Sequence, residues 1–401
     1  MVAEIDSYTY YSDSPDILHS VNEWRELDKK HLHIKVDLPE GWPKKLTGPH
    51  VWRGEELRKN PEKYKYYFTL EDLSEIHKAV KKFKQLGLPL RKVGRENFNL
   101  GSLGSKLEDF SEDLYKGIGV RLLRGFNIDD YDEQERLIAY LGISSYIGDI
   151  RDAQGLNRAL THIKSIAHVP KEERAPIGVS QQTTDPQMYH SDFGGDIVSL
   201  LVLGTPANGG ESLISSTYSI YNYLAQHRPD IIKVLTSPEG YKRKGFPEGA
   251  PLIFYENDEL ITSFSTRNFI GFGEIPRDKS YPLISSEERD AVGGFNAIAY
   301  KYTLETDLQK GDIEYVNNLI NQHCRKGYLE DEDHRRHLAR LWLRNSKYTF
   351  LLKLPQEIKE KRNQIFPVEY EQEIPLNEFE EDEIKVKSGA DSIDKFYAKP
   401  K

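Results

Sequence analysis

Before about residue 145, apolar residues recur at helical spacing in two segments of the chain. In LEDLSEIHKAVKKFKQLG they recur every three to four residues from Leu70 to Phe83, with acids early, lysines late and Gly87 as a stop. This spacing predicts an amphipathic helix. YDEQERLIAYLG predicts a second helix that ends at Gly142, and the apolar run within Gly117–Gly125 predicts a strand before it.

Between about residues 160 and 350 the pattern changes to short apolar runs bounded by turn residues. The runs are DIVSLLVLG, ESLISS, PLIFYE, ELITSFS and RRHLARLWLR, and one predicted helix, at roughly Ser219–His227, interrupts them. Neither a βαβ alternation nor a glycine-rich phosphate turn is visible. We therefore expect a mainly β protein with flanking helices and a double-stranded β-helix (jelly-roll) core.

The same patterns suggest three regions. Residues 1–114 are expected to form an N-terminal arm and a helix that pack on the core, because the first 60 or so show no sustained period. Residues 115–365 are expected to form the jelly-roll domain. Residues 366–401 are charged and poor in apolar groups, which predicts a mobile or surface-hugging tail.

Composition narrows the class of protein. A net charge of -9 and the absence of a long basic run argue against nucleic acid or an acidic membrane surface as the main partner. The lysines of the first predicted helix are interpreted as a solvated face: Lys78, Lys81, Lys82 and Lys84. We expect a small-molecule substrate instead, and the sequence does not indicate an oligomeric state.

Cysteine usage and hydropathy indicate the compartment. Cys324 is the single cysteine, so an intrachain disulfide is excluded and a reducing environment is the simplest inference. The N-terminus lacks an apolar signal region, and no apolar run is long enough to span a membrane. A cytoplasmic location is therefore expected.

The motif His190-Ser191-Asp192 is the first candidate for chemistry. With 12 histidines and 64 acids in the chain, about two His-x-acid matches are expected by chance, and this is the only one. Residues i and i+2 of a strand point to the same side, and the apolar run that follows would anchor both side chains. Two histidines and one carboxylate on one side of a metal form the ligand set of non-heme Fe(II) oxygenases.

Three histidines are candidates for the remaining ligand. His323 is preferred because it ends the turn-and-strand segment GDIEYVNNLINQH. His334 lies among acids, as a solvated surface histidine would. His337 is expected on the strand face opposite Arg336, packed with core residues.

Two arginines point to an anion. Arg336 and Arg340 lie four residues apart on one face of the last predicted strand, where an inward charge is costly unless an anion pairs with it. A dicarboxylate co-substrate would supply that anion, since a guanidinium binds a carboxylate in bidentate fashion. Structural salt bridges to the many acids are the alternative.

Together these motifs resemble the taurine dioxygenase-like (TauD/TfdA) family of Fe(II)/2-oxoglutarate-dependent dioxygenases, and most closely its large fungal, clavaminate synthase-like branch. The resemblance runs from about Trp42 to Arg344. The matching stretches are LTGPHVW, YHSDFGGDIVSLL, GGESLISSTYSIYNYL, FSTRNFIG, GDIEYVNN and RRHLARLWLRN.

The resemblance implies a role for each motif. His190, Asp192 and His323 are implied as the catalytic iron ligands. The hydroxyl of Ser212, after Gly209-Gly210, and Arg336 are implied to anchor the distal carboxylate of 2-oxoglutarate. Arg340 is similar to the family's second arginine, near the co-substrate and substrate carboxylates.

The resemblance also implies the reaction. With Fe(II), 2-oxoglutarate and O2, the family oxidises a C–H bond by hydroxylation, desaturation or ring closure, and releases succinate and CO2. Two positions depart from its pattern: Ser212 stands where threonine is frequent, and Cys324 follows the distal histidine, which would leave an oxidisable thiol beside iron.

The substrate is not defined by the sequence. Asn157, Arg158 and Arg267 could each receive a carboxylate or polar group, or pair with a neighbouring acid. The fungal branch acts on amino acids and on intermediates of secondary metabolism, so a molecule of that kind is implied. A zinc-dependent hydrolase that uses the same His/Asp/His site, and a non-catalytic metabolite-binding jelly roll, are the alternatives.

Overall fold

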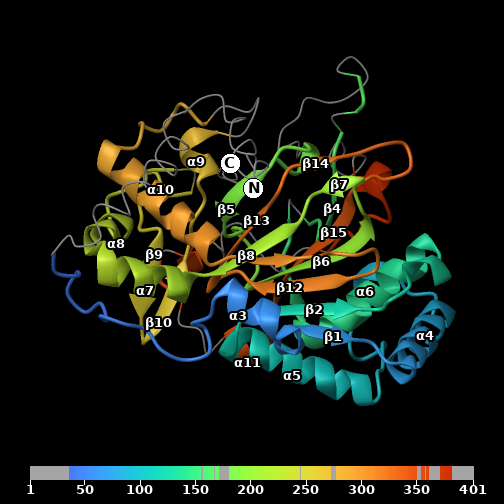
Figure 1. Ribbon diagram of the computed structural model, residues 1–401. Helices are drawn as coiled ribbons and strands as arrows, with labels where there is room; N and C mark the ends of the chain where they lie inside the picture. Colours follow the sequence, from blue (N-terminus) through green and yellow to red (C-terminus); the bar gives the residue numbers. More distant parts are fainter. Residues whose placement is uncertain are drawn as a thin grey trace.

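A computed structural model describes residues 36–154, 157–166, 168–170, 180–243, 245–271, 277–349, 354–356, 358–360 and 371–381. Two sheets form the centre, and helices cover them on the outside (Figure 1). The first 35 residues of the expected arm, and most of the expected tail, lie outside the described residues.

The larger sheet has seven strands in the order β1-β2-β12-β6-β15-β3, with β4 also paired to β15. All of its pairs are antiparallel except β1 with β2. The strands are β1 (Lys65–Tyr67), β2 (Val120–Arg124), β3 (Ile150–Arg151), β4 (Leu160–Lys164), β6 (Ile197–Gly204), β12 (Ile313–Asn317) and β15 (His337–Arg344).

The smaller sheet has four antiparallel strands in the order β11-β8-β13-β5. These are β5 (Gln187–His190), β8 (Ser212–Ser216), β11 (Leu304–Thr306) and β13 (Asn321–Arg325). Two further antiparallel pairs lie among the described residues: β7 (Asn208–Gly209) with β14 (Tyr328–Leu329), and β9 (Ile253–Glu256) with β10 (Glu259–Thr262). All five predicted runs are strands, and the jelly-roll prediction is confirmed.

Helices lie on both sides of this core. Beside the larger sheet are α4 (Leu70–Gln85), α5 (Ser102–Lys116) and α6 (Glu133–Ile147), at the lower right of Figure 1. On the other side are α7 (Thr217–His227), α8 (Pro229–Leu235) and α10 (Ser286–Lys301). Shorter helices are α3 (Gly54–Lys59), α9 (Arg267–Ile270) and α11 (Ser346–Thr349).

The prediction of one helix among the strands was wrong, since α8, α9 and α10 lie there as well. The longest of them, α10, has Gly293-Gly294 in its middle, which lowers its intrinsic helix propensity. Its start was readable, because Ser285 and Glu288 form a capping box. Burial of its apolar face stabilises this helix despite the two glycines.

The predicted end of the second helix was also wrong. α6 continues past Gly142 to Ile147 and is tied to the larger sheet by hydrogen bonds, Tyr140 to Ser199 and Ser144 to Tyr315, each of 2.9 Å. A Cβ at Gly142 would lie 2.3 Å from the Phe98 ring. This glycine therefore permits close packing and does not end the helix.

Gly142→Ala is expected to lower the free energy of unfolding by ~1–3 kcal/mol, because overpacking against Phe98 outweighs the better helix propensity of alanine. Denaturant unfolding measures it. Gln134→Ala, at an exposed position of the same helix, is the control and should change stability by less than about 0.5 kcal/mol. Equal stability of the two variants would contradict the packing role of Gly142.

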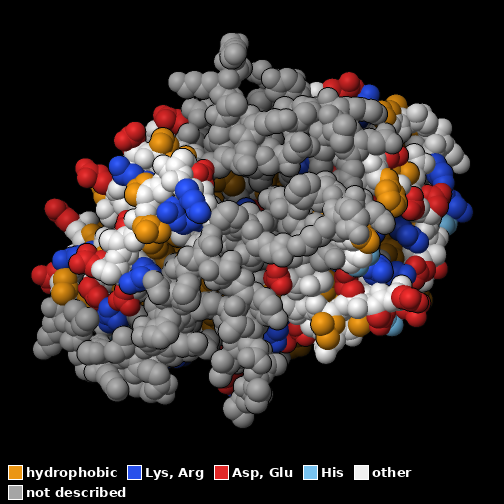
Figure 2. Space-filling view, turned by 90° about the horizontal axis from the view of Figure 1, so that it is seen from above, with side chains coloured by type: hydrophobic (Ala, Val, Ile, Leu, Met, Phe, Trp, Pro, Cys, Tyr) orange, Lys and Arg blue, Asp and Glu red, His pale blue; other side chains and the backbone are white. Residues whose placement is uncertain are grey.

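The surface agrees with a mixed charge pattern. The described residues visible from above carry acidic and basic side chains next to one another (Figure 2). The four lysines of α4 are exposed, as predicted, and Lys84 pairs with Asp132 and Glu135. Among the described helices, none combines the length and the apolar character that a membrane span requires.

Near the C-terminus, residues 371–381 pack against β4. Glu381 is 1% exposed and accepts a hydrogen bond from the backbone N–H of His162 at 2.7 Å. Ile374 and Leu376 pack against the hydrophobic core. The described part of the expected tail therefore adheres to the domain.

Candidate active site

Three predicted ligands come together at one end of the smaller sheet. His190 is the last residue of β5 and lies directly opposite His323 of β13, with ring centroids 4.4 Å apart. Asp192 Oδ1 lies 3.5 Å from His190 Nε2 and 3.9 Å from His323 Nε2. Among the described residues, these three form the one group of histidine and carboxylate side chains with metal-ligand spacing.

The expectation that His190 and Asp192 share one strand was wrong. β5 ends at His190, and Asp192 lies in the loop that leads to β6. Asn318 holds this loop from both sides: its side-chain oxygen accepts from the Asp192 N–H, and its amide donates to the Asp192 carbonyl, both at 2.6 Å. The side chain of Asn318, and not strand pairing, therefore holds Asp192 in position.

The second oxygen of Asp192 is held from the larger sheet. Oδ2 accepts from Arg340 at 3.0 Å and from the Trp342 indole N–H at 2.8 Å, both on β15. Burial opposes ionisation of Asp192, but the Arg340 charge and the two histidines outweigh it and hold its pKa well below the usual range. The carboxylate stays charged, with Oδ1 directed at the histidines.

The protonation states fit a divalent metal. His190 Nδ1 lies 2.8 Å from the Met188 carbonyl, a contact that places its proton on Nδ1 and leaves Nε2 as a lone-pair donor. Burial and the neighbouring His190 lower the pKa of His323 to about 3, so this ring is neutral. Two imidazoles and one carboxylate are a donor set that Fe(II) binds.

Trp342→Phe is expected to weaken Fe(II) binding about tenfold, because it removes one of the two donors that orient Asp192 Oδ2. Anaerobic Fe(II) titration measures the change. Trp52→Phe is the matched control, since that indole donates to a distant backbone carbonyl, Ile118, at 2.9 Å. Unchanged affinity in Trp342→Phe would show that Arg340 alone orients the carboxylate.

Arg336 directly precedes β15 and is buried, 5% exposed. Burial and the neighbouring Arg325 lower its pKa to about 9. Within the described part of the chain, no acid forms an ion pair with its guanidinium, which lies 5.5 Å from the centre of the Tyr328 ring. A buried, unmatched guanidinium of this kind requires an anion.

The Gly209-Gly210 motif makes room for this arginine. Both glycines have φ of +78°, a conformation that L side chains rarely adopt. A Cβ at Gly210 would lie 3.3 Å from both Arg336 Cδ and Tyr328 Cβ. Ser212 follows at the start of β8, 6% exposed, in register with Arg325, two residues beyond His323.

Arg340, the predicted second arginine, contacts the candidate ligand Asp192 directly. Besides its bond to Asp192, its Nε donates to the side chain of Gln154 at 2.7 Å. Gln154 in turn donates to the Arg340 carbonyl at 2.8 Å. The structure thus gives Arg340 the position of a support for Asp192, and its contact with the co-substrate stays a prediction.

The three candidate substrate residues are not brought together. Asn157 donates to the Glu371 carbonyl. Arg158 lies 3.4 Å from Glu381 and donates to the Gln154 carbonyl. None of these contacts is with the His/Asp/His cluster. Arg267 is exposed and begins α9, two residues after Ser265, which forms a bridge with His190.

The other histidines and Cys324 lie outside the cluster. His334 is exposed and bonded to Asp331, and His337 pairs with His162 at 2.8 Å, so both match the structural roles expected of them. Cys324 alternates to the face opposite His323, where its Sγ lies 3.9 Å from the Tyr300 hydroxyl. Burial raises the pKa of this thiol, so a reactive thiolate beside the metal is disfavoured.

Several supporting residues were missed by the sequence prediction. Asn318 and Gln154 carry no pattern that separates them from turn residues. Trp342 alternates with leucines in an apolar strand and resembles a core residue. Glu314 lies in GDIEYVNN, where an alternating strand would place it toward solvent, yet it is 1% exposed.

A jelly roll that joins a His/Asp/His cluster to a buried, unmatched arginine defines a non-heme iron oxygenase with an anionic co-substrate. Comparison with known families specifies it further. Residues 82–342 match the model of the taurine catabolism dioxygenase TauD, TfdA family, and the chain belongs to this family.

Two curated proteins are similar over most of the chain. A taurine hydroxylase-like protein, SAT17, of Stachybotrys chartarum is 29% identical over 82% of this chain and 87% of its own. FR-33289 synthase of Streptomyces rubellomurinus is 25% identical over 75% of this chain and 90% of its own.

Solved structures share the fold at low sequence identity. Asparagine oxygenase in complex with Fe(II), hydroxyasparagine and succinate is 14% identical with a TM-score of 0.54, over 73% of this chain and 98% of its own. The non-heme iron oxygenase OrfP with Fe and alpha-ketoglutaric acid is 15% identical with a TM-score of 0.51, over 73% and 98%.

The protein is therefore an Fe(II)/2-oxoglutarate-dependent oxygenase that uses O2 to oxidise a small molecule. Neither the hydrolase nor the non-catalytic alternative receives support from these relatives.

Proposed function

We propose that this enzyme hydroxylates a C–H bond of an amino acid or a natural-product intermediate, with iron held by His190, Asp192 and His323. Arg336 and Ser212 bind the distal carboxylate of 2-oxoglutarate. When bound, Fe(II), 2-oxoglutarate and O2 supply an oxidation that converts the C–H bond to C–OH and 2-oxoglutarate to succinate and CO2.

The observation that carries the assignment of the co-substrate site is Arg336. Its guanidinium is buried without an anionic partner among the described residues, whereas two arginines of the larger sheet have one: Arg124 pairs with Asp312, and Arg344 pairs with Asp152. A dicarboxylate supplies the missing charge at one end and keeps its keto-acid end free for the metal.

The remaining residues orient these groups. Met188 and Asn318 fix His190 and Asp192 through the backbone, and Arg340 with Trp342 fixes the carboxylate oxygen that does not face the histidines. Rigid ligands on one side confine the co-substrate and the substrate to the other side.

Substrate placement is proposed at Arg267. Ser265, two residues earlier, forms a β-bridge with His190. A carboxylate bound at Arg267 would therefore hold an amino acid close to the proposed iron ligands. The descriptions of the relatives, a taurine hydroxylase-like protein and an asparagine oxygenase with a hydroxylated amino acid, support a zwitterionic substrate and hydroxylation as the outcome.

The experiment that tests the site needs no substrate. Fe(II) is added to the anaerobic apo-protein, 2-oxoglutarate is titrated, and the visible charge-transfer band of an iron-chelated keto acid is followed. A saturable band supports the proposed site. Iron bound without such a band would overturn it. Succinate release in a screen of amino acids then identifies the substrate.

A further inference from the structure

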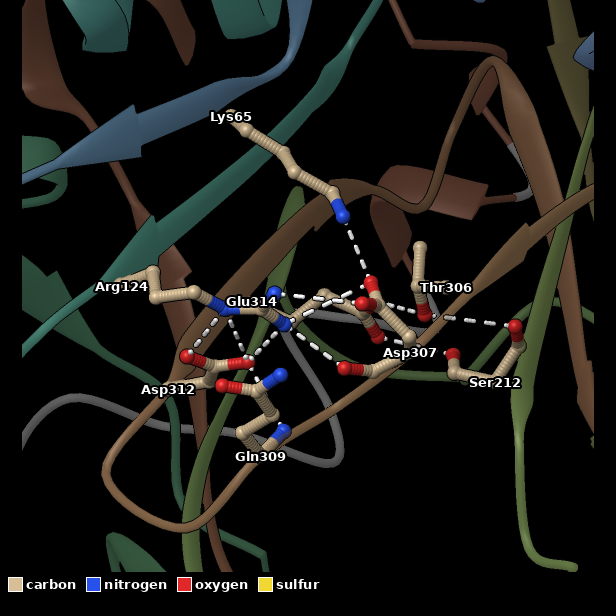
Figure 3. Close-up of polar contacts among 8 residues, drawn as sticks. All are labelled: Lys65, Arg124, Ser212, Thr306, Asp307, Gln309, Asp312 and Glu314. Atoms are coloured by element: carbon tan, nitrogen blue, oxygen red, sulfur yellow. Dashed lines mark hydrogen bonds and ion pairs between the residues drawn. The ribbon is translucent and has the colours of Figure 1, made fainter. Parts of the chain in front are cut away.

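One buried carboxyl near the co-substrate site has no part in the chemistry above. Glu314 lies on β12, a central strand of the larger sheet, and reaches across to the smaller one. Its Oε2 lies 2.8 Å from the Ser212 hydroxyl and its Oε1 lies 2.9 Å from the Thr306 hydroxyl (Figure 3). Burying an ionised carboxyl costs free energy unless its charge is paired or it takes up a proton.

The charged groups beside Glu314 neutralise one another. Lys65, on β1, lies 2.6 Å from Asp307. Arg124, on β2, lies 2.7 Å from Asp312 and 3.2 Å from Asp307. These two cations and two acids form a closed group in Figure 3 and leave no surplus positive charge for Glu314.

Arg336 is the cation left to interact with Glu314, and it cannot serve two carboxylates equally. Arg325, the next guanidinium, donates to the backbone carbonyls of Thr183 and Asp185. An ionised Glu314 would compete with the distal carboxylate of 2-oxoglutarate for Arg336 and would repel it. A neutral Glu314 removes both effects.

Burial favours the neutral form. It raises the pKa of Glu314, against the hydrogen bonds of Ser212 and Thr306, which lower it. The nearby Asp312 raises this pKa further, and Arg336 lowers it.

The number of hydroxyl hydrogens at the site gives a second, independent reason for a neutral Glu314. Ser212 has one hydroxyl hydrogen. If Glu314 is ionised, Ser212 must donate that hydrogen to Oε2 and presents only lone pairs to a bound carboxylate. If Glu314 is neutral, its own O–H donates to Ser212 Oγ, and Thr306 donates to Oε1. The Ser212 hydrogen is then free to point at the co-substrate.

We propose that Glu314 is a positioning residue for co-substrate binding: as a neutral carboxyl it donates to Ser212 Oγ and turns the Ser212 hydrogen toward the distal carboxylate of 2-oxoglutarate. This inference rests on the proposed function, since it assumes that Ser212 and Arg336 bind that carboxylate. Binding at high pH then requires uptake of one proton by Glu314.

The dissociation constant of 2-oxoglutarate, read from the charge-transfer band of the anaerobic Fe(II) protein, tests this across the pH range in which the protein keeps its iron. In the wild-type protein, affinity should fall as pH rises through the pKa of Glu314, because only the neutral form binds. Glu314→Gln should match the low-pH affinity of the wild-type protein within about threefold and lose this pH dependence, because an amide N–H replaces the carboxyl O–H permanently.

Glu314→Leu removes the donor and should weaken 2-oxoglutarate roughly tenfold at every pH. In a Ser212→Ala background it should cause no further loss, because both substitutions remove the same hydrogen bond. Asp72→Asn is the control: it neutralises a carboxyl that is buried on α4, where it bonds to Tyr66 and Lys106, and it should leave the affinity and its pH profile unchanged.

The outcomes separate the two proposals. No band in the wild-type protein would refute the proposed co-substrate site itself. If the wild-type protein gives the band but Glu314→Gln still loses affinity for 2-oxoglutarate as pH rises, the role of Glu314 alone would be overturned. Equal effects of Asp72→Asn and Glu314→Leu would also overturn that role. If Glu314→Leu does not fold, the pH profile of Glu314→Gln decides.

Discussion

His323→Ala is expected to lose Fe(II) binding and turnover together. The substitution removes one of the three partly buried groups that face a common point, and the remaining His190 and Asp192 cannot hold the metal against water. We expect Fe(II) affinity to fall by more than about a hundredfold, since even changes behind the ligands cost ten- to a hundredfold. Metal analysis after anaerobic loading measures it.

The neighbouring histidines provide the controls. His334→Ala changes an exposed ring bonded to Asp331, and His337→Ala changes a ring that pairs with His162. Both variants should retain iron and turnover. Retained turnover in His323→Ala, combined with loss in either control, would move the third ligand to one of them.

Arg336→Met is expected to retain iron and to weaken 2-oxoglutarate about a hundredfold or more. Methionine preserves much of the buried stem and removes the charge that the co-substrate neutralises. For the same reason, the variant should be more stable to heat than the wild-type apo-protein, because an unmatched buried charge is gone. The 2-oxoglutarate titration and thermal unfolding measure the two effects.

Arg335→Met is the matched control, one residue earlier in the chain and only partly buried. It should leave the affinity for 2-oxoglutarate within about threefold of wild type. An equal loss of affinity in both variants would attribute the effect to disturbance of β15. Unchanged affinity in Arg336→Met would place the carboxylate elsewhere.

The sequence predicted the strands well because their signal is local. Alternating or continuous apolar runs between turn residues identified β6, β8, β9, β10 and β15. Helix boundaries were harder to predict where a glycine could either end a helix or permit close packing within it. Gly142 resembles a helix stop, and only its contact with Phe98 shows that it is a packing residue of α6.

Residue type, spacing and the family resemblance predicted the His/Asp/His cluster, but not the residues that support it. His190 and Asp192 are close in sequence, and the register of β5 with β13 adds His323. The groups that orient Asp192 come from distant segments, Asn318 and Trp342, and become neighbours only when the sheets pack. No local pattern encodes such contacts.

The sequence also failed to predict that Glu314 is buried. In a strand with one solvated face, an acid at its position would be ordinary. β12 lies between β2 and β6 and is buried along its whole length, so the same acid becomes a buried proton carrier. The order of strands in the sheet, which the sequence does not reveal, decides between the two meanings.

The central place of β15 also sets an order of events during synthesis. This strand lies between β6 and β4, so β4 can join the sheet only after about 170 further residues have left the ribosome. β15 also brings Arg340 and Trp342 to Asp192. A nascent chain therefore orients Asp192 only late in synthesis, after β15 has joined the sheet.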